Sequence, residues 1–271
     1  MAESLSPHAL GTVADLLRHL KRDSSASEQD QERCILSGNE AVGWMERRTA
    51  RRLRARTYRN SETITGTWSS GGTSISGSGF TSTVKVLDQM LAAGLQPGTR
   101  ADVVAASTIT ISEPATAAGS GVSITVGSEP LVADGTGSPL LWIAETPVIE
   151  VYGAAYRDAT GASTSIDLTG ARLVSETGKY VLMNDAFPSG TLNIEIECAA
   201  GYRPPSATVA WNEDWQNLRR LWLRVAEIIY QDSDQLMGRR DSRRLAQSDV
   251  TIGWKMPEDV EVGIEAYARK P

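Results

Sequence analysis

Residues 208–231 constrain the fold of this chain more than any other segment, because they are amphipathic and rich in tryptophan. Their apolar residues recur at spacings of three and four, which is the repeat of one face of an α-helix. The side chains expected in this buried face are Trp211, Trp215, Leu218, Trp222, Val225 and Ile229. Such a face needs a partner, and the comparable apolar pattern lies near the N-terminus, at residues 28–54. We therefore expect two helices that are distant in sequence to pack together, with β-structure inserted between them.

The N-terminal region is expected to contain a short helix and a long one. Residues 9–20 carry valine and leucine at helical spacing, and Thr12 is a suitable N-cap. After a polar break, Ser24 or Ser27 can cap the longer pattern at residues 28–54. Small residues lie on or beside its apolar face: Gly38, Ala41 and Gly43. These small residues would let a tryptophan-rich helix approach closely.

The segment between the two helices changes to short alternating runs of β-branched residues punctuated by glycine, which is typical of strands. The expected fold class is therefore α+β, with a small α-helical bundle formed by the N- and C-terminal helices and interrupted by inserted antiparallel β-regions. The expected parts are N-terminal helices at 1–59, an extra Gly/Ser/Thr-rich β-domain at 60–139, an antiparallel β-meander at 140–205, and the long helix with a C-terminal tail at 206–271.

The composition is that of an ordinary globular protein, with 41% hydrophobic and 22% charged residues. The net charge of -6 gives no whole-protein signature of nucleic-acid binding. No apolar run approaches the ~20 residues that span a bilayer, and the polar start lacks the apolar core of a signal peptide. We expect a protein made in the cytoplasm with no membrane partner. Cys34 and Cys198 are expected as small buried side chains.

The residues that most enzymes use are scarce in this sequence. The only histidines are His8 and His19, so a Ser-His-Asp or Cys-His site would have to use one of them. No cluster of histidine and cysteine has the spacing of a zinc site. Gly178 and Lys179 superficially match a phosphate loop, but the pattern around them favours a hairpin turn. We predict a protein that is not an enzyme and that carries no cofactor and no metal.

Two basic or aromatic features remain as candidate binding sites. Arg47, Arg48, Arg51 and Arg52 would form a ridge at i, i+4 spacing on a helix, able to face phosphates or acidic protein. The alternative is a solvated helix end whose positive charge suits the C-terminal dipole. Trp254 follows a polar stretch and is a candidate anchor on a partner.

The order of these segments resembles that of the head–tail adaptor (connector) proteins of long-tailed bacteriophages. Those proteins have a helix pair, a strand set that starts "PV…V…Y.D..G" and ends "V…AGY", and a final helix of the form "L..A…L…Y". The matching residues are Pro147, Val148, Val151, Tyr156, Asp158 and Gly161, then Ala200, Gly201 and Tyr202, then Leu218, Leu221, Ala226 and Tyr230. The resemblance covers residues 10–59 and 141–269, and its specificity lies in the order of the motifs.

The resemblance implies a structural virion protein of the neck, made in the host cytoplasm. Members of the family form rings, commonly of twelve subunits, beneath the portal, and they bind the portal on one side and a head-closure or tail protein on the other. Genomic DNA passes through the ring without sequence specificity. The C-terminal segment is then the expected portal-docking element, through Trp254, Met256, Val260, Ile264, Tyr267 and Arg269.

Two other functions remain open. The β-region could be a virion decoration or receptor-binding module that recognises a glycan through Trp68, Phe80 and Trp142, although strand cores explain these aromatic residues equally well. A DNA-binding protein could use the arginine-rich stretch from Arg47 to Arg59, and this function predicts a steep salt dependence of DNA affinity.

Overall fold

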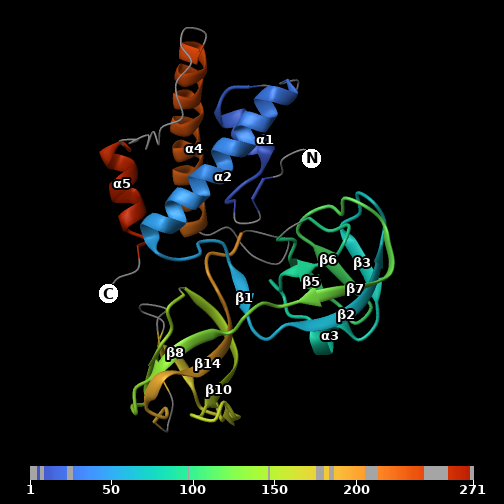
Figure 1. Ribbon diagram of the computed structural model, residues 1–271, viewed down its shortest axis with the longest axis vertical. Coiled ribbons are helices and arrows are strands. Elements are labelled where there is room, and N and C mark those ends of the chain that lie inside the picture. Colours follow the sequence, from blue (N-terminus) through green and yellow to red (C-terminus); the bar gives the residue numbers. More distant parts are fainter. Residues whose placement is uncertain are drawn as a thin grey trace. The chain divides into compact units, whose positions relative to one another are not determined.

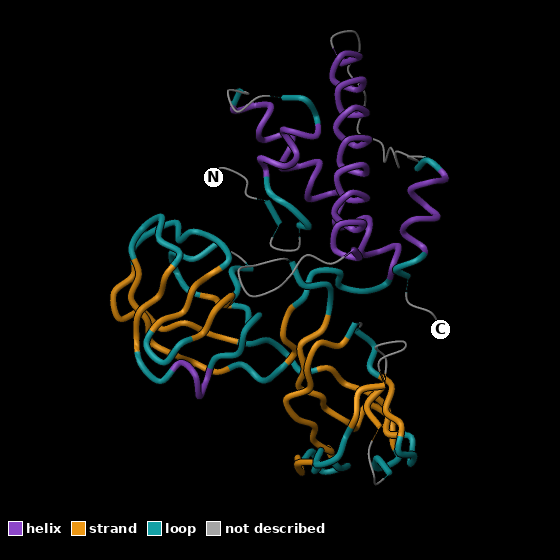
Figure 2. The backbone as a smooth tube through the Cα atoms, turned by 180° about the vertical axis from the view of Figure 1, so that it is seen from behind, coloured by secondary structure: helices purple, strands orange, loops and turns teal. Residues whose placement is uncertain are grey.

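The structure is a computed structural model that describes residues 5–6, 9–22, 27–96, 98–145, 147–174, 180–182, 186–204, 213–240 and 256–268. The chain forms two compact units, one made of Met1–Arg54 with Arg203–Pro271 and the other of Ala55–Tyr202 (Figure 1). The first unit is helical and the second is built of antiparallel strands, shown in purple and orange in Figure 2. The predicted α+β class, with β-structure inserted into a helical frame, is confirmed.

The helical unit combines an N-terminal and a C-terminal segment of the chain. It contains α1 (Val13–His19), α2 (Glu28–Thr49), α4 (Glu213–Arg240) and α5 (Glu258–Glu265). Helix α2 packs against α4, and α1 and α5 each contact both of them. The predicted pairing of an N-terminal helix with the tryptophan-rich helix is therefore confirmed. Helix α4 is described from Glu213 onward, so Trp211 lies outside the described residues.

The helix starts follow the predicted caps. The Thr12 hydroxyl accepts from the backbone N–H of Asp15 at 3.2 Å, and the Asp15 carboxylate accepts from the Thr12 N–H at 2.9 Å, so the pair forms a capping box. The Ser27 hydroxyl accepts from the Asp30 N–H at 3.2 Å. Ser24 lies outside the described residues.

The end of α2 was predicted wrongly, since the helix stops at Thr49 and not near residue 54. Ala50 adopts a left-handed conformation with φ 53°. The next N–H, that of Arg51, bonds back to the Glu46 carbonyl at 3.3 Å. This is the hydrogen-bond pattern of a Schellman motif, which closes a helix. The arginine ridge at i, i+4 spacing is therefore not continued by helix to Arg51 and Arg52.

The first β-region of the second unit is a six-stranded sheet in the order β4-β7-β2-β3-β6-β5. Its strands are β2 (Glu62–Trp68), β3 (Ser74–Gly77), β4 (Met90–Leu91), β5 (Ala101–Val104), β6 (Thr108–Ile111) and β7 (Gly119–Val126). The short helix α3 (Phe80–Thr83) contacts β2. Alternate residues along the strands point inward, and Ile75, Ile109 and Ile124 are fully buried in its core. The strands predicted in this glycine-rich stretch are confirmed.

The second β-region is organised around its longest strand, β14 (Gly190–Ala200). One side of β14 pairs with β10 (Val148–Arg157), which pairs in turn with β11 (Ser163–Ile166). The other side pairs with β1 (Arg56–Tyr58) and β8 (Leu131–Gly135). A separate three-stranded sheet holds β9 (Leu140–Trp142), β12 (Arg172–Val174) and β13 (Tyr180–Leu182).

The predicted meander at 140–205 is therefore wrong, because consecutive strands do not all pair with one another. β11 does not pair with β12, and β13 does not pair with β14. The eleven-residue β14 and ten-residue β10 satisfy many backbone groups by pairing with each other, and this pairing buries Ile194, Ile196 and Cys198. Strand β8, placed by the sequence in the extra β-domain, belongs to this sheet.

Candidate functional site

The tryptophan face of α4 is the interior of the helical unit. Trp215, Leu218, Trp222, Val225 and Ile229 are all buried. The indole Nε1 of Trp222 donates to the backbone carbonyl of Gly38 at 3.0 Å. A Cβ added at Gly38 would lie 3.2 Å from the Trp222 ring, and one at Gly11 would lie 2.7 Å from it. The glycines therefore make room for the indole, and this face is closed to a partner.

The C-terminal segment expected to dock on a portal turns one face inward. Met256, Val260, Ile264 and Tyr267 are buried, and α5 contacts α2 and α4. A Cβ at Gly263 would lie 2.8 Å from Leu221 Cδ2, so α5 and α4 pack closely at this point. Trp254 and Arg269, the two ends of the expected docking set, lie outside the described residues. In this structure the apolar face of α5 is part of the core of the helical unit.

The arginines at the end of α2 are spread between solvent and ion pairs. Arg47, Arg48 and Arg52 are exposed, and Arg51 is half-buried. Arg48 pairs with Glu265 of α5 at 3.4 Å, and Arg52 pairs with Glu46. These contacts partly neutralise the positive charge that a DNA-facing ridge would need.

Arg59, at the far end of the arginine-rich stretch, lies inside the β-unit. Its guanidinium donates to the fully buried Asp88 carboxylate at 2.6 Å and 2.9 Å, and to Glu62 at 2.6 Å. Burial by itself lowers the pKa of Arg59, but the hydrogen bonds and charges of Asp88 and Glu62 outweigh it and raise the pKa. Thr57 also donates to Asp88, at 2.7 Å. Arg59 is thus a structural residue that fastens the start of β2 to the loop before β4.

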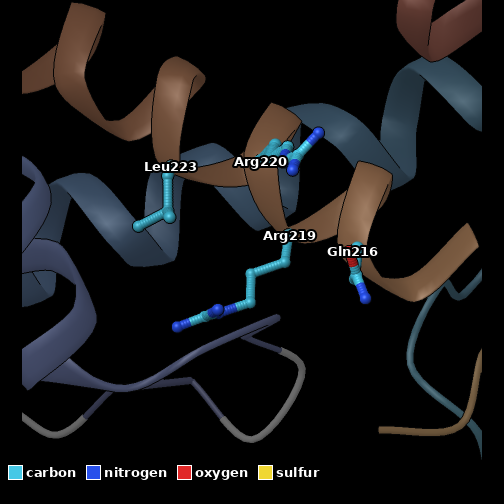
Figure 3. Close-up of a pocket in the computed structure, with 4 residues that line it drawn as sticks. All are labelled: Gln216, Arg219, Arg220 and Leu223. Carbon is cyan, nitrogen blue, oxygen red and sulfur yellow. The ribbon is translucent and has the colours of Figure 1, made fainter. Parts of the chain in front are cut away.

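A shallow hollow of about 300 Å³ lies on α4 (Figure 3). Gln216, Arg219, Arg220 and Leu223 line it. Arg219 extends from the helix and pairs with Asp15 at 2.6 Å, while Arg220 is exposed. Sequence reasoning missed this site, because it followed the apolar face of the helix only. The sequence does contain a signal for it, because these four lining residues form a second row at i, i+3, i+4 and i+7 spacing on the same helix.

The aromatic residues proposed to bind a glycan do not lie together on an exposed surface. Trp68 and Phe80 are buried in the core of the six-stranded sheet. The Trp68 Nε1 donates to the Ala117 carbonyl at 2.9 Å, which satisfies its polar group internally. Trp142 on β9 is 40% exposed and is the member of the three that reaches solvent.

The strand motifs behind the family resemblance meet in one antiparallel ladder. Val148 is opposite Ala200 and Val151 is opposite Cys198, and the Gly201 N–H donates to the Pro147 carbonyl at 2.9 Å. The start of one motif and the end of the other are thus neighbours in the sheet.

Two further motif residues, Asp158 and Gly161, form the turn after β10. Asp158 Oδ1 accepts from the Thr160 hydroxyl at 2.6 Å and from the Ala162 N–H at 3.0 Å. Gly161 has φ 83°, a left-handed conformation that glycine adopts without strain. Asp158 and Gly161 therefore have structural tasks.

The histidine and cysteine side chains that the structure describes are engaged structurally or buried. The His19 ring contacts the Glu227 carboxylate at 3.2 Å, and His8 lies outside the described residues. Cys34 and Cys198 are free and buried, as predicted, and burial raises the pKa of Cys198 to about 12. Among the residues that the structure describes, no group of three or more His, Cys, Asp or Glu side chains could hold a metal ion. Gly178 and Lys179 lie outside those residues.

No helix within the described ranges is long and apolar enough to cross a lipid bilayer. No protein-family model matches the chain, and no curated protein matches it. A solved structure described as "Neck of empty GTA particle computed with C6 symmetry" is similar over 100% of this chain and 95% of that chain. The sequence identity is 14% and the TM-score is 0.43.

Proposed function

We propose that this chain is a structural protein of a phage-like virion neck. In this proposal it is a head–tail adaptor subunit that forms a ring beneath the capsid portal and joins the portal to head-closure or tail components. DNA passes through the ring. The observation that carries the proposal is the ordered set of adaptor-like motifs, whose residues help to build the framework of each unit. The strand motifs share the β10–β14 ladder, and the last helix motif lies on α4, packed against α2.

The motif residues of α4 support the proposal because they hold the helical unit together. Leu218 and Ala226 are fully buried, and Leu221 contacts α5 at Gly263. The Tyr230 hydroxyl donates to Asp30 of α2 at 3.1 Å. The motif thus describes how the two ends of the chain join, which is the feature the adaptor family shares in sequence order.

The charge of the chain suits a channel component. A net charge of -6 repels DNA weakly overall, so a long duplex would not be held tightly along the ring during transit. Repeated contact between identical subunits needs only modest pairwise affinity when a ring closes. Twelve subunits are the number that the family resemblance implies.

The main test is the location and effect of the chain in assembled particles. Particles made without it are expected to contain filled heads that fail to join tails, and the tagged chain is expected at the portal vertex in electron micrographs. The purified chain is expected to bind purified portal. The proposal would be contradicted if the purified chain never binds portal and assembled particles contain it elsewhere than at the neck.

Portal docking through Met256, Val260, Ile264 and Tyr267 is part of the same proposal, with a condition. These side chains are buried, so docking through them requires α5 to leave α2 and α4. The close approach of Gly263 to Leu221 offers a test, because Leu221→Cys with Gly263→Cys can tether α5 by a disulfide. The oxidised variant is expected to lose portal binding and to regain it on reduction. Unchanged binding of the tethered protein would mean that this face stays internal.

A receptor-binding β-module is the second candidate, favoured by the exposure of Trp142 and Leu140, at 40% and 45%, on β9. The structure defines a clean deletion for separating the candidates. Glu62 is opposite Val126, and the Ser128 N–H donates to the Arg59 carbonyl at 3.0 Å, so residues 62–126 can be removed between adjacent ends.

The deletion is combined with Arg59→Ser, because Asp88 is removed with the sheet. Normal tail attachment is expected in this variant if the chain is an adaptor, and so is normal tail attachment in Trp142→Ala. Lost host binding with intact tails, in either variant, would favour the receptor-binding module.

DNA binding through Arg47, Arg48, Arg51 and Arg52 is the least favoured function, because two of these arginines are committed to ion pairs. It predicts duplex binding that weakens steeply as salt rises. DNA affinity that does not change with salt, or no DNA binding at low salt, would exclude this function.

A further inference from the structure

The outward face of α5 is an acidic row with an apolar residue in it. Glu258, Glu261, Val262 and Glu265 have i, i+3, i+4 and i+7 spacing, so they lie along one side of the helix. Val262 is 61% exposed, which makes it one of the most exposed large apolar side chains in the described residues. The opposite side of the helix, with Val260 and Ile264, is buried. Glu258 and Val262 are exposed and Glu261 is half-buried, while Glu265 at the end of the row pairs with Arg48 of α2 at 3.4 Å.

The hollow on α4 has the complementary character and the same spacing. Gln216, Arg219, Arg220 and Leu223 are also at i, i+3, i+4 and i+7. Seven residues of helix span about 10 Å, so the two rows have equal length. Arg220 is exposed and makes no ion pair with any residue that the structure describes. Leu223 is a half-buried apolar residue at the end of this basic row.

The two rows lie on opposite flanks of α4. Leu221 marks the flank that contacts α5, at Gly263. With 3.6 residues per turn, Leu221 is about 150° around the helix from the middle of the row that lines the hollow. The Arg219–Asp15 ion pair of 2.6 Å shows that the hollow lies on the flank that faces α1. The acidic row and the basic row of one subunit therefore cannot meet each other.

We propose that the acidic row of α5 in one copy of this chain docks into the α4 hollow of the next copy. Glu258 and Glu261 then face Arg220, and Val262 packs near Leu223, while Glu265 and Arg219 keep their ion pairs with Arg48 and Asp15. The contact is heterologous, because two different surfaces meet, and such contacts form rings when the rotation closes. This inference rests on the proposed adaptor function and names the surfaces that would join its subunits.

The contact predicts a specific pattern of disulfides. Val262→Cys and Leu223→Cys in the same chain give each copy one reactive thiol on each surface, and the native Cys34 and Cys198 are buried. Mild oxidation of this double variant is expected to give a ladder of linked oligomers, both in the concentrated protein and in assembled particles. A mixture of the two single variants is expected to stop at dimers, because each chain then has one thiol. No ladder in either preparation, or only dimers from the double variant, would overturn the inference.

A charge swap tests the same contact without cysteine. Arg220→Glu replaces an attraction by a repulsion at an exposed site, and we expect it to weaken association about tenfold per contact. Glu261→Arg is expected to have the same effect alone and to restore association when combined with Arg220→Glu. Circular dichroism should change little, since Arg220 is exposed and Glu261→Arg removes one of three acidic residues in the first turn of α5. Single variants that assemble as the native chain does, or a double variant that stays impaired, would contradict the pairing.

These outcomes separate the contact from the proposed function. If the chain is found at the neck but residues 223 and 262 never cross-link, the contact is wrong and the adaptor function stands. If the two positions cross-link into rings but particles hold the chain elsewhere, the contact stands and the adaptor function is wrong.

Discussion

Replacement of Trp222 by alanine should destabilise the helical unit selectively. The indole is fully buried and is bounded by Gly11 and Gly38, whose lack of side chains creates its space. Because two glycines line the site, few neighbouring side chains can collapse into the void. Removal of a large buried aromatic residue costs about 3–5 kcal/mol, and a void that cannot close gives the upper end of that range.

The loss should be visible as a shift in one thermal transition. The helical unit and the β-unit are compact on their own, so they can unfold separately. For a unit of this size, about 3–5 kcal/mol corresponds to a decrease in Tm of about 10–20 °C. Helical circular dichroism and calorimetry on the full chain would measure it.

Trp142→Ala is the matched control, because it makes the same chemical change in the β-unit at a side chain that is 40% exposed. It is expected to leave the helical transition in place and to cause a smaller shift in the transition of the β-unit. If Trp222→Ala changes stability by less than about 1 kcal/mol, or moves the β transition instead, the packing argument is wrong.

Three further predictions follow from local geometry. Gly43→Ala should stabilise α2 by about 0.5–1 kcal/mol, since the added methyl meets only the end of an arginine side chain. Gly38→Ala should destabilise it, because its methyl would lie 2.8 Å from a buried leucine. Denaturant titrations in which both substitutions change the free energy of unfolding in the same direction would contradict this. The Thr160 hydroxyl lowers the pKa of Asp158, so the contribution of this turn to stability is present above the pKa of the unfolded state and lost as pH falls through the pKa of the folded state. An NMR titration of the Asp158 carboxyl should show that Thr160→Ala raises its pKa in the folded chain. An unchanged pKa would refute the assignment. Burial raises the pKa of Cys198 to about 12, so a thiol reagent at neutral pH should label it only after unfolding, and rapid native labelling would show that the strand opens.

Local features of the helical unit were predictable because their causes are local. The caps at Thr12 and Ser27 depend on side chains three residues away from their targets. The end of α2 was not predictable in the same way, because glycine usually takes the left-handed closing position and here Ala50 takes it. The arginines beyond it have high helix propensity, so the sequence favoured a longer helix than the one that forms.

Strand positions were predictable but strand partners were not. Alternation along β14 marks Ile194, Ile196 and Cys198 as one inward face, whatever lies beside the strand. Its neighbours β1, β8 and β10 come from three distant parts of the chain, and nothing in the alternation selects them. The chain order suggested a meander, and pairing between the longest strands overrode it.

The candidate surfaces show a related limit of sequence reasoning. The apolar face of α5 was read as a docking face, and the structure turns Val260 and Ile264 into the core of the helical unit. A short amphipathic helix has one apolar side, and its sequence does not say whether the same chain or another molecule covers it. The exposed position of Val262 on α5 could be assigned only once the opposite side of that helix was seen to be buried.

The motifs and the surfaces thus carry different kinds of information. The motif residues are occupied inside the chain: Asp158 and Gly161 form a turn, Leu218 fills a core, and Tyr230 joins two helices. A resemblance built on them argues for a shared framework and leaves the partners undetermined. Partners are selected by residues with no internal task, and Arg220 on α4 and Glu261 with Val262 on α5 are of that kind. Substitutions there should alter assembly while the fold persists, whereas substitutions in the motifs should alter both, and this difference is what experiments on the chain can measure.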